Sequence, residues 1–356
     1  MKLAPIKKNI LKDLGPDPVA TAKAARLVYI NGNEEGISRV KAGKVFVYKF
    51  HNKTVKDKIQ LQRIRSLVLP PAWTDVWICL QSNGHRQATG MDIKNRKQYR
   101  YHSSWNEVRD KTKFFRLLEL GKVLPILRKK VKKDLALPGL PKNKVLAAVI
   151  TLMEKTGIRI GNEVYEKLYG SFGLTTLKDK HTIINGGEIK FTFRGKKGVE
   201  HCVTLKNKKL SKIVNQCRDI PGQELFQYID EEGKRQSIDS GMVNDYIKQI
   251  AEAEFTAKDL RTWRGTVTAF VALQEVGAFK TETEGKKKVV EVLDKVAEQL
   301  GNSRTVCRKY YVHPALLELY AQGKLEAAPV KKDTVTQEFK GLQPEEKTLI
   351  TILKKL

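Results

Sequence analysis

Four residues suited to phosphodiester chemistry are spread over more than 150 positions of this chain, from 159 to 311. They are Arg159 in Thr-Gly-Ile-Arg-Ile-Gly, Lys196 in Phe-Arg-Gly-Lys-Lys-Gly, Arg261 in Lys-Asp-Leu-Arg-Thr-Trp and Tyr311 in Cys-Arg-Lys-Tyr-Tyr. Two guanidinium groups can bind the non-bridging oxygens of a phosphate, where charge develops in the transition state. A lysine can protonate the leaving oxygen, and a tyrosine can be the covalent nucleophile. Together these side chains could cleave a phosphodiester without a metal.

Each of these residues also has a purely structural interpretation. Arg159 lies between two isoleucines and could form a buried ion pair with Glu163. Arg261 could pair in the same way with Asp259. Lys196 could be an ordinary solvated lysine of a turn. The sequence pattern of each residue by itself leaves both interpretations open.

The charge of the chain indicates the kind of partner. Its 356 residues include 67 Lys and Arg against 39 Asp and Glu, a formal net charge of +28. Such an excess favours a polyanion, nucleic acid first and an acidic membrane second. The hydrophobic content of 41% is typical of a globular protein, and the length suggests about two domains.

Several motifs that would indicate other classes of protein are missing from the sequence. The four cysteines (Cys79, Cys202, Cys217 and Cys307) form no Cys-x-x-Cys pair, so we expect reduced thiols and no zinc ribbon. There is no apolar leader and no apolar run of 18 residues, so we expect a cytoplasmic protein outside the membrane. There is neither a phosphate-binding Gly-rich loop nor a carboxylate cluster with two-metal spacing, so we expect no ATP, metal or other cofactor.

The residue pattern changes near position 103 and predicts two domains, 1–103 and 104–356. In the first, residues 45–50, 76–80 and 96–101 read as strands, and residues 58–69 as a short helix before two prolines. The second is predicted to be mostly helical with a small β insert. Its predicted helices are 106–133, 141–155, 242–254, 256–276, 287–300, 315–322 and a short amphipathic helix at the C-terminus, with another resuming near Ser211; its predicted strands are 182–184, 189–194 and 199–205.

Three local features of the second domain refine this prediction. Gly195 to Gly198 are expected to form the hairpin turn that carries Lys196. Thr256 and Asp259 have the spacing of a capping box. The charged, glycine-containing segment 282–288 is expected to be a loop.

The strand 96–101 is a candidate DNA contact, because basic and aromatic residues alternate along it. Cations suit phosphates, and flat rings or a glutamine suit base edges. A solvated edge strand protected by lysines is the structural alternative. The two faces are Arg96, Gln98 and Arg100 on one side and Lys97, Tyr99 and Tyr101 on the other.

From about residue 37 to residue 320, the chain resembles the type IB DNA topoisomerases of the bacterial and poxvirus-like branch. The stretches that carry the resemblance are LPPAWTDVWI at 69–78, GHRQATG at 84–90, RKQYRYH at 96–102, SFGLTTL at 171–177, PGQELFQY at 221–228, FTAKDLRTW at 255–263 and VCRKYYVHP at 306–314. These stretches are long and specific.

The resemblance implies an α+β fold in which a small β-rich N-terminal domain and a larger, mostly α-helical catalytic domain with a small β-hairpin form a clamp around double-stranded DNA. It implies an isomerase that relaxes supercoils by reversible nicking through a 3′-phosphotyrosyl bond, without ATP or metal. It further implies a monomer with no obligate protein partner, associated with the nucleoid in the cytoplasm.

The resemblance also assigns roles to residues. By position in the motifs, Arg159 and Arg261 hold the scissile phosphate, Lys196 protonates the 5′-oxygen, and Tyr311 is the nucleophile. Tyr99 and Tyr101, with Gln98, fall where the family touches the major groove. Arg96, at the start of the same strand, is a further expected DNA contact.

Asn302 takes a catalytic position that is a histidine in the viral enzymes and looks like asparagine in bacterial relatives. An asparagine can donate one neutral hydrogen bond to a phosphate oxygen but supplies no positive charge. Arg304 departs from the proline that relatives tend to carry.

Two rival functions remain from the sequence. A tyrosine recombinase uses much the same chemistry, but its usual His-x-x-Arg segment is here Lys258-Asp259-Leu260-Arg261, without the histidine. A non-catalytic DNA-binding protein with structural site residues is the second. Relaxation of a supercoiled plasmid distinguishes all three.

Overall fold

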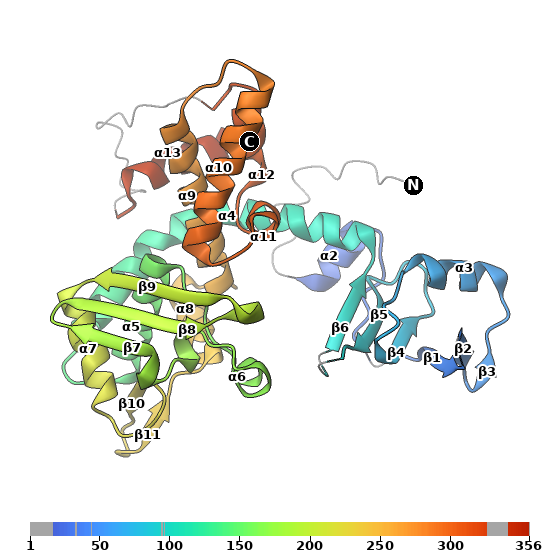
Figure 1. The fold of residues 1–356 in the computed structure, drawn as a ribbon, viewed down its shortest axis with the longest axis horizontal. Helices are drawn as coiled ribbons and strands as arrows, with labels where there is room; N and C mark the ends of the chain where they lie inside the picture. Colours follow the sequence, from blue (N-terminus) through green and yellow to red (C-terminus); the bar gives the residue numbers. More distant parts are fainter. Residues whose placement is uncertain are drawn as a thin grey trace. The chain divides into compact units, whose positions relative to one another are not determined.

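The protein is described by a computed structural model that covers residues 17–32, 34–43, 45–93, 95, 97–325 and 341–355. The chain forms two compact units, Met1–Arg116 and Leu117–Leu356. Their division falls inside the long helix α4 (Ser103–Asp134), which begins at the predicted domain boundary (Figure 1). Strands dominate the first unit and helices the second, which confirms the predicted α+β class.

The N-terminal unit is built on an antiparallel sheet of order β3-β2-β1-β4-β5-β6. The predicted strands are confirmed as β2 (Val45–Phe50), β4 (Thr74–Cys79) and β6 (Lys97–Tyr101), and the predicted helix as α3 (Lys58–Ser66). Ile37, Ile64 and Ile78 are buried between α3 and the sheet. Helix α2 (Pro18–Ala24) packs instead with Trp105 and Val108 of α4.

Strands β1 (Gly36–Ala42), β3 (Lys53–Thr54) and β5 (Arg86–Met91) were not predicted. The β5 sequence, Arg-Gln-Ala-Thr-Gly-Met, carries few residues with high strand propensity. Its Gln87 is nonetheless buried, because its amide donates to the carbonyl oxygens of residues 81, 82 and 84. Tertiary pairing with β4 and β6 therefore determines this strand.

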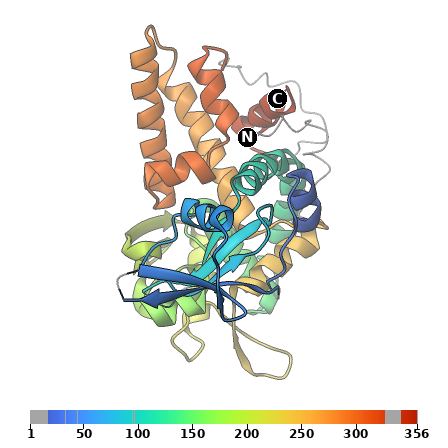
Figure 2. The same ribbon diagram turned by 90° about the vertical axis from the view of Figure 1, so that its right-hand side faces the viewer.

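The second unit is mostly helical and also contains a three-stranded sheet of order β7-β8-β9 and a two-stranded sheet β10-β11. The helices are α5 (Lys142–Thr156), α6 (Glu163–Tyr169), α7 (Lys208–Arg218), α8 (Ser240–Ala251), α9 (Ala257–Val276), α10 (Glu282–Leu300), α11 (Arg304–Tyr310), α12 (Pro314–Ala321) and α13 (Pro344–Lys355). The strands are β7 (Thr182–Asn185), β8 (Glu188–Arg194), β9 (Glu200–Lys206), β10 (Gln227–Ile229) and β11 (Arg235–Ser237). The β10–β11 pair projects at the end of this unit opposite to α10 and α12 (Figure 2).

Helices α5 and α9 form the centre of this unit. Leu152, Met153, Leu260, Phe270 and their neighbours are almost fully buried. The predicted capping box begins α9, because the Asp259 carboxylate accepts from the Thr256 backbone N–H at 2.9 Å and from its hydroxyl at 2.7 Å. None of the helices in the described ranges is both long and apolar enough to cross a bilayer.

The prediction of a loop at 282–288 is wrong, because α10 begins at Glu282. Thr281 caps the helix by accepting from the Glu284 backbone N–H. The charges of this segment are spaced for pairs one turn apart, Glu282 with Lys286 at 2.7 Å and Glu284 with Lys288 at 3.0 Å. The charges of this segment therefore belong to the solvated face of a helix and not to a loop.

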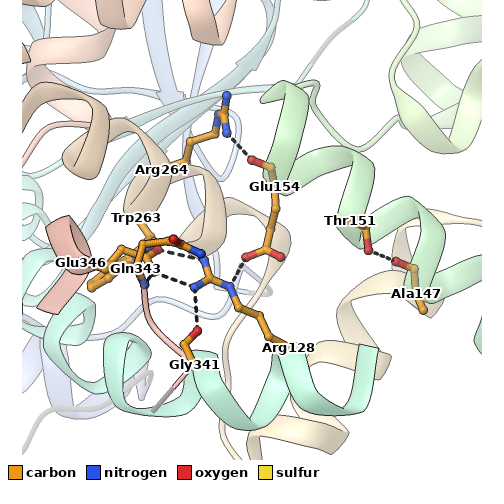
Figure 3. Close-up of polar contacts among 9 residues, drawn as sticks. All are labelled: Arg128, Ala147, Thr151, Glu154, Trp263, Arg264, Gly341, Gln343 and Glu346. Carbon is orange, nitrogen blue, oxygen red and sulfur yellow. Dashed lines mark hydrogen bonds and ion pairs between the residues drawn. The ribbon is translucent and has the colours of Figure 1, made fainter. Parts of the chain in front are cut away.

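The C-terminal helix α13 is attached through a buried ion pair (Figure 3). The Arg128 guanidinium of α4 donates both Nη atoms to the Glu346 carboxylate, at 2.7 and 2.8 Å, and its Nε to Glu154 of α5 at 3.1 Å. The Trp263 indole N–H donates to the same Glu346 carboxylate at 2.9 Å, and Arg264 donates to the Glu154 backbone carbonyl. Helices α4, α5, α9 and α13 are therefore held together at one point, and α9 carries Arg261.

Candidate active site

Four of the five predicted catalytic residues come from four separate elements of the second unit, and the fifth, Asn302, lies between α10 and α11. Arg159 lies in the segment after α5, where Gly157 takes the left-handed conformation that ends the helix, with φ 69°. Lys196 opens the short turn Lys196–Gly198 between β8 and β9. Arg261 lies one turn inside α9, and Tyr311 is the C-cap residue that directly follows α11.

Arg159 is bound to the segment that carries Asn302. Its guanidinium donates to the Asn302 side-chain oxygen and, at 3.3 Å, to the Gly301 backbone oxygen. The Asn302 amide nitrogen is consequently the atom left to donate elsewhere, and it is buried without a hydrogen-bond partner in the part of the chain that the structure describes. The alternative ion pair with Glu163 is wrong, since Glu163 approaches Lys167 instead.

Arg261 is a buried cation with unused donors. The residue is 4% exposed, and its Nη2 donates to the Leu300 backbone oxygen at 3.0 Å. Among the described residues, Nε and Nη1 have no hydrogen-bond partner, and the Asp259 carboxylate is engaged in the capping box. Burial, opposed by Tyr311 and reinforced by Arg159, lowers the pKa of Arg261 to about 10. A buried guanidinium without a carboxylate partner is costly unless an anion binds it, so this arrangement indicates an anion site.

The Tyr311 ring lies beside this guanidinium, with the Arg261 Cζ 5.2 Å from the ring centroid. Burial by itself would raise the pKa of the Tyr311 phenol. Arg261 and Arg159, with Lys258 of α9, outweigh burial and lower that pKa below its usual value of 10. The site therefore stabilises the phenolate, the nucleophilic form, relative to that of a tyrosine in water.

Tyr310 has a different environment from Tyr311. It is the last residue of α11, and the Lys309 ammonium lies 5.3 Å from its ring centroid. Tyr311 has left the helical conformation, with φ −129° and ψ −12°, and its backbone oxygen accepts from the Thr266 hydroxyl of α9 at 3.1 Å. Because Tyr311 is no longer helical, the change of backbone conformation between residues 310 and 311 sets the different directions of the two rings.

Lys196 is exposed to solvent, as is expected of a turn lysine. The charges of the other site residues nevertheless affect its ammonium group. Desolvation lowers the pKa of its ammonium, as do Arg159, Lys197 and Lys258, while Tyr311 raises it. The lysine nitrogen lies 5.7 Å from the ring centroid of Tyr165 on α6. A lowered pKa makes the ammonium a better proton donor to an alkoxide leaving group.

Two further residues lie at this site and were not predicted as site residues from the sequence. Lys258 lies one turn before Arg261 on α9, and the Lys-x-x-Arg spacing could have indicated it. His201 of β9 packs against Gly195 and Gly301, two segments that are far apart in the sequence, so no local pattern could have indicated it.

The sequence did not explain why residue 304 is an arginine. In the structure, Arg304 of α11 forms an ion pair with α10. Its Nε and Nη2 atoms donate to the two carboxylate oxygens of Asp294, both at 2.7 Å. This surface pair fixes the turn that holds Asn302 between the two helices.

Strand β6 presents the predicted DNA-binding residues at one edge of the N-terminal sheet. Tyr99 is 44% exposed and stacks on Tyr101 at 5.9 Å between ring centroids, with the Arg86 Cζ 5.6 Å from the Tyr99 ring. Gln98 points to the other face, where its amide donates to Asp92 at 2.9 Å. Arg96 lies outside the described residues.

Among the described residues, no group of three or more His, Cys, Asp and Glu side chains is arranged to hold a metal ion.

Comparison with known proteins agrees with this geometry. Residues 102–339 match the family model "Eukaryotic DNA topoisomerase I, catalytic core", and residues 46–92 match "Bacterial DNA topoisomerase IB, N-terminal domain". DNA topoisomerase 1B of Acanthamoeba polyphaga mimivirus is 35% identical over 295 residues, which are 80% of this chain and 88% of the relative. DNA topoisomerase 1B of vaccinia virus (strain Copenhagen) is 25% identical over 286 residues, 78% of this chain and 88% of the relative.

A solved structure of the XerH site-specific recombinase bound to its difH substrate overlaps 56% of this chain and 51% of its own, with 18% identity and a TM-score of 0.33. That overlap carries no argument about function. The family models and the viral relatives do: the chain belongs to the type IB DNA topoisomerase family.

Proposed function

We propose that this protein relaxes supercoiled double-stranded DNA by nicking one strand through a 3′-phosphotyrosyl intermediate and resealing it. The observation that carries the proposal is the pair formed by Tyr311 and Arg261. A phenol of lowered pKa lies beside a buried guanidinium whose Nε and Nη1 have no partner among the described residues. A phosphodiester placed there would meet a nucleophile and an anion-binding group at once.

In the proposed cleavage step, the Tyr311 oxygen attacks phosphorus, and the bond from phosphorus to the 5′-oxygen breaks. Lys196 gives its proton to the departing 5′-oxygen, and the phenolic proton of Tyr311 leaves to solvent. Arg159 and the free N–H groups of Arg261 stabilise the non-bridging oxygens, and the Asn302 amide adds a neutral hydrogen bond.

Resealing reverses these movements. The 5′-hydroxyl attacks the phosphotyrosyl ester, Lys196 takes back the proton, and Tyr311 departs as phenolate. One ester is exchanged for another in each direction, so no nucleotide is consumed. The exposed position of Lys196 is consistent with access to a DNA end that must rotate and return.

The partner is double-stranded DNA, which the net charge of +28 also favours. We propose that the two units act as a clamp on the duplex, and that the protein works as a monomer without an obligate protein partner, in the cytoplasm at the nucleoid.

The experiment that tests this proposal is relaxation of a negatively supercoiled plasmid in excess EDTA without ATP. We expect full relaxation, with a transient nicked species that carries covalently bound protein after denaturation. A requirement for a divalent metal, or recombination between two DNAs in place of relaxation, would contradict it. Stimulation by magnesium through faster product release would be compatible with it.

A further inference from the structure

His201 lies between the two segments that carry Lys196 and Asn302. Its imidazole packs on Gly195, the residue before Lys196, and on Gly301, the residue before Asn302. A Cβ on Gly195 would lie 2.6 Å from the imidazole Cδ2 and Nε2, and a Cβ on Gly301 would overlap the imidazole Cε1. The ring therefore fills the space between two glycines that are 106 positions apart (301 − 195).

Gly195 is a glycine because of its contact with the His201 imidazole and not because of its backbone conformation. Its φ of −92° and ψ of −166° are open to any residue, so the turn itself does not demand glycine. The imidazole does, because it occupies the place of a Cβ. Gly301 is required twice, since it also has the left-handed φ of 55° that ends α10.

The imidazole is held on its other side by the sheet. His201 is paired in register with Phe193 of β8, and the two rings lie parallel, 4.9 Å apart with an interplanar angle of 1°. Phe193 is 4% exposed and has little room to move. The turn is closed by the Gly195 backbone N–H, which donates to the Val199 oxygen at 2.7 Å.

Burial lowers the pKa of His201, and so do the nearby Arg159 and Arg261, while Glu200 has the opposite effect. The imidazole is consequently neutral at pH 7 and adds no charge to a site that already holds two guanidinium groups.

We propose that His201 is a positioning residue that fixes the Lys196 turn against the Gly301–Asn302 segment, so that the proton donor and the phosphate-binding groups keep one relative position. The proposal rests on the proposed cleavage reaction and adds to it a residue that does not touch the DNA. If the imidazole is lost, a void opens beside Gly195 and the turn can shift. Displacements of about 1 Å at a reacting group can cost about 10²-fold in rate.

The first test is His201→Ala, assayed by single-turnover cleavage of a DNA duplex under conditions in which the wild-type protein cleaves. We expect cleavage to be slower by roughly 10- to 100-fold, with unchanged equilibrium binding. A duplex with sulfur in place of the 5′-bridging oxygen has a leaving group that needs no proton, so it should restore most of the lost rate. Val203→Ala, on the same face of β9 and paired with Phe191, is the matched control and should cleave both duplexes like the wild type.

The sulfur duplex distinguishes a displaced lysine from general damage. A slow His201→Ala protein that sulfur does not restore would overturn the proposal, as would an oxygen-duplex rate equal to that of the wild type. If the wild-type protein itself cleaves neither duplex, the proposed function fails instead, which is a different result.

Two further variants test the packing argument even if His201→Ala is unstable. His201→Phe keeps a flat ring against Phe193 and should retain most of the cleavage rate; a folded His201→Phe protein as slow as His201→Ala would contradict a packing role. Gly195→Ala should slow cleavage because its Cβ meets the imidazole, and it should add little in the His201→Ala background. Additive effects of the two substitutions would show that the residues do not act through one contact.

Discussion

The Arg261 guanidinium lies over the Tyr311 ring, with its carbon 5.2 Å from the ring centroid, although the two residues are 50 positions apart in the chain (311 − 261). The approach is close because α9 has no side chain at Gly265. A Cβ there would lie 2.7 Å from the Tyr311 backbone oxygen and 3.0 Å from its Cβ. The Thr266 hydroxyl then fixes that same oxygen. The end of α11 is thus seated directly on the helix that supplies the guanidinium.

The first prediction concerns the nucleophile. Tyr311→Phe removes one oxygen, keeps the ring packing, and should abolish nicking and relaxation while DNA binding persists. Tyr310→Phe is the matched control and should retain substantial relaxation. Peptide mapping of the trapped complex should find DNA on Tyr311. Attachment to Tyr310, or relaxation by Tyr311→Phe, would overturn the assignment.

The second prediction concerns the leaving-group lysine. Lys196→Ala should slow cleavage by roughly 10²–10⁴-fold, the usual contribution of a general acid. The 5′-sulfur duplex should largely restore the rate. Lys197→Ala is the control in the same turn and should cleave normally. If Lys197→Ala is the slow protein that sulfur rescues, the wrong lysine has been chosen.

The third prediction is a pH dependence with two limbs. Cleavage needs the Tyr311 phenolate and the Lys196 ammonium, and the pKa of each is lowered in the structure. The rate should therefore rise as pH approaches the lowered pKa of Tyr311, and fall as Lys196 loses its proton at higher pH. Arg261→Gln removes the main charge that lowers the Tyr311 pKa, so the rising limb should move to higher pH.

Single-turnover pH profiles on oxygen and 5′-sulfur duplexes check this assignment. The falling limb should disappear with the sulfur duplex, because its leaving group needs no proton. A falling limb that persists with sulfur would assign that limb to a group other than Lys196.

The fourth prediction concerns strand β6. Affinity for DNA should fall steeply with salt, since Lys and Arg side chains release counterions from several phosphates. Tyr99→Ala or Tyr101→Ala should weaken binding or shift the cleavage position while Tyr311 stays reactive. Gel shifts and cleavage mapping measure both. Unchanged affinity and unchanged cleavage position would mean that β6 is a solvated edge strand.

The fifth prediction concerns the buried ion pair that anchors α13. Glu346→Gln leaves the Arg128 guanidinium without its main counter-charge and should lower the free energy of unfolding by about 3 kcal/mol. Burial raises the pKa of Glu346, but Arg128, Trp263 and the Gln343 backbone N–H lower it more, and the net pKa is below its usual value. The stability gained from ionised Glu346 is therefore present above the unfolded pKa of about 4.3 and is lost as pH falls through the lower folded pKa.

Urea unfolding at several pH values, for the wild type, Glu346→Gln and the neighbouring control Glu345→Gln, measures this effect. The difference between wild type and Glu346→Gln should shrink in acid. A difference that is independent of pH down to the acid limit of folding would show that the charge of Glu346 contributes nothing.

Much of the fold was predictable because its signals are local. Short runs of strand-forming residues bounded by turn residues predicted β2, β4 and β8, and helical spacing predicted α5 and α9, including the Thr256–Asp259 capping box that begins α9. The sequence misled at 282–288, where charges that form pairs one turn apart on α10 resemble the charges of a loop. The sequence did not predict β5, because its residues form a strand only through pairing with β4 and β6.

The same distinction holds for the site. The residue types of Arg159, Lys196, Arg261 and Tyr311, and the family motifs around them, determined by themselves which chemistry the chain could perform. Only the tertiary structure decided that Arg159 orients Asn302 and that Arg261 keeps two donors free. These hydrogen bonds join residues that are far apart in the chain, so they depend on which donors and acceptors packing brings together. His201 belongs wholly to this second kind, because a histidine on a strand acquires its role from two glycines that only the folded chain brings to it.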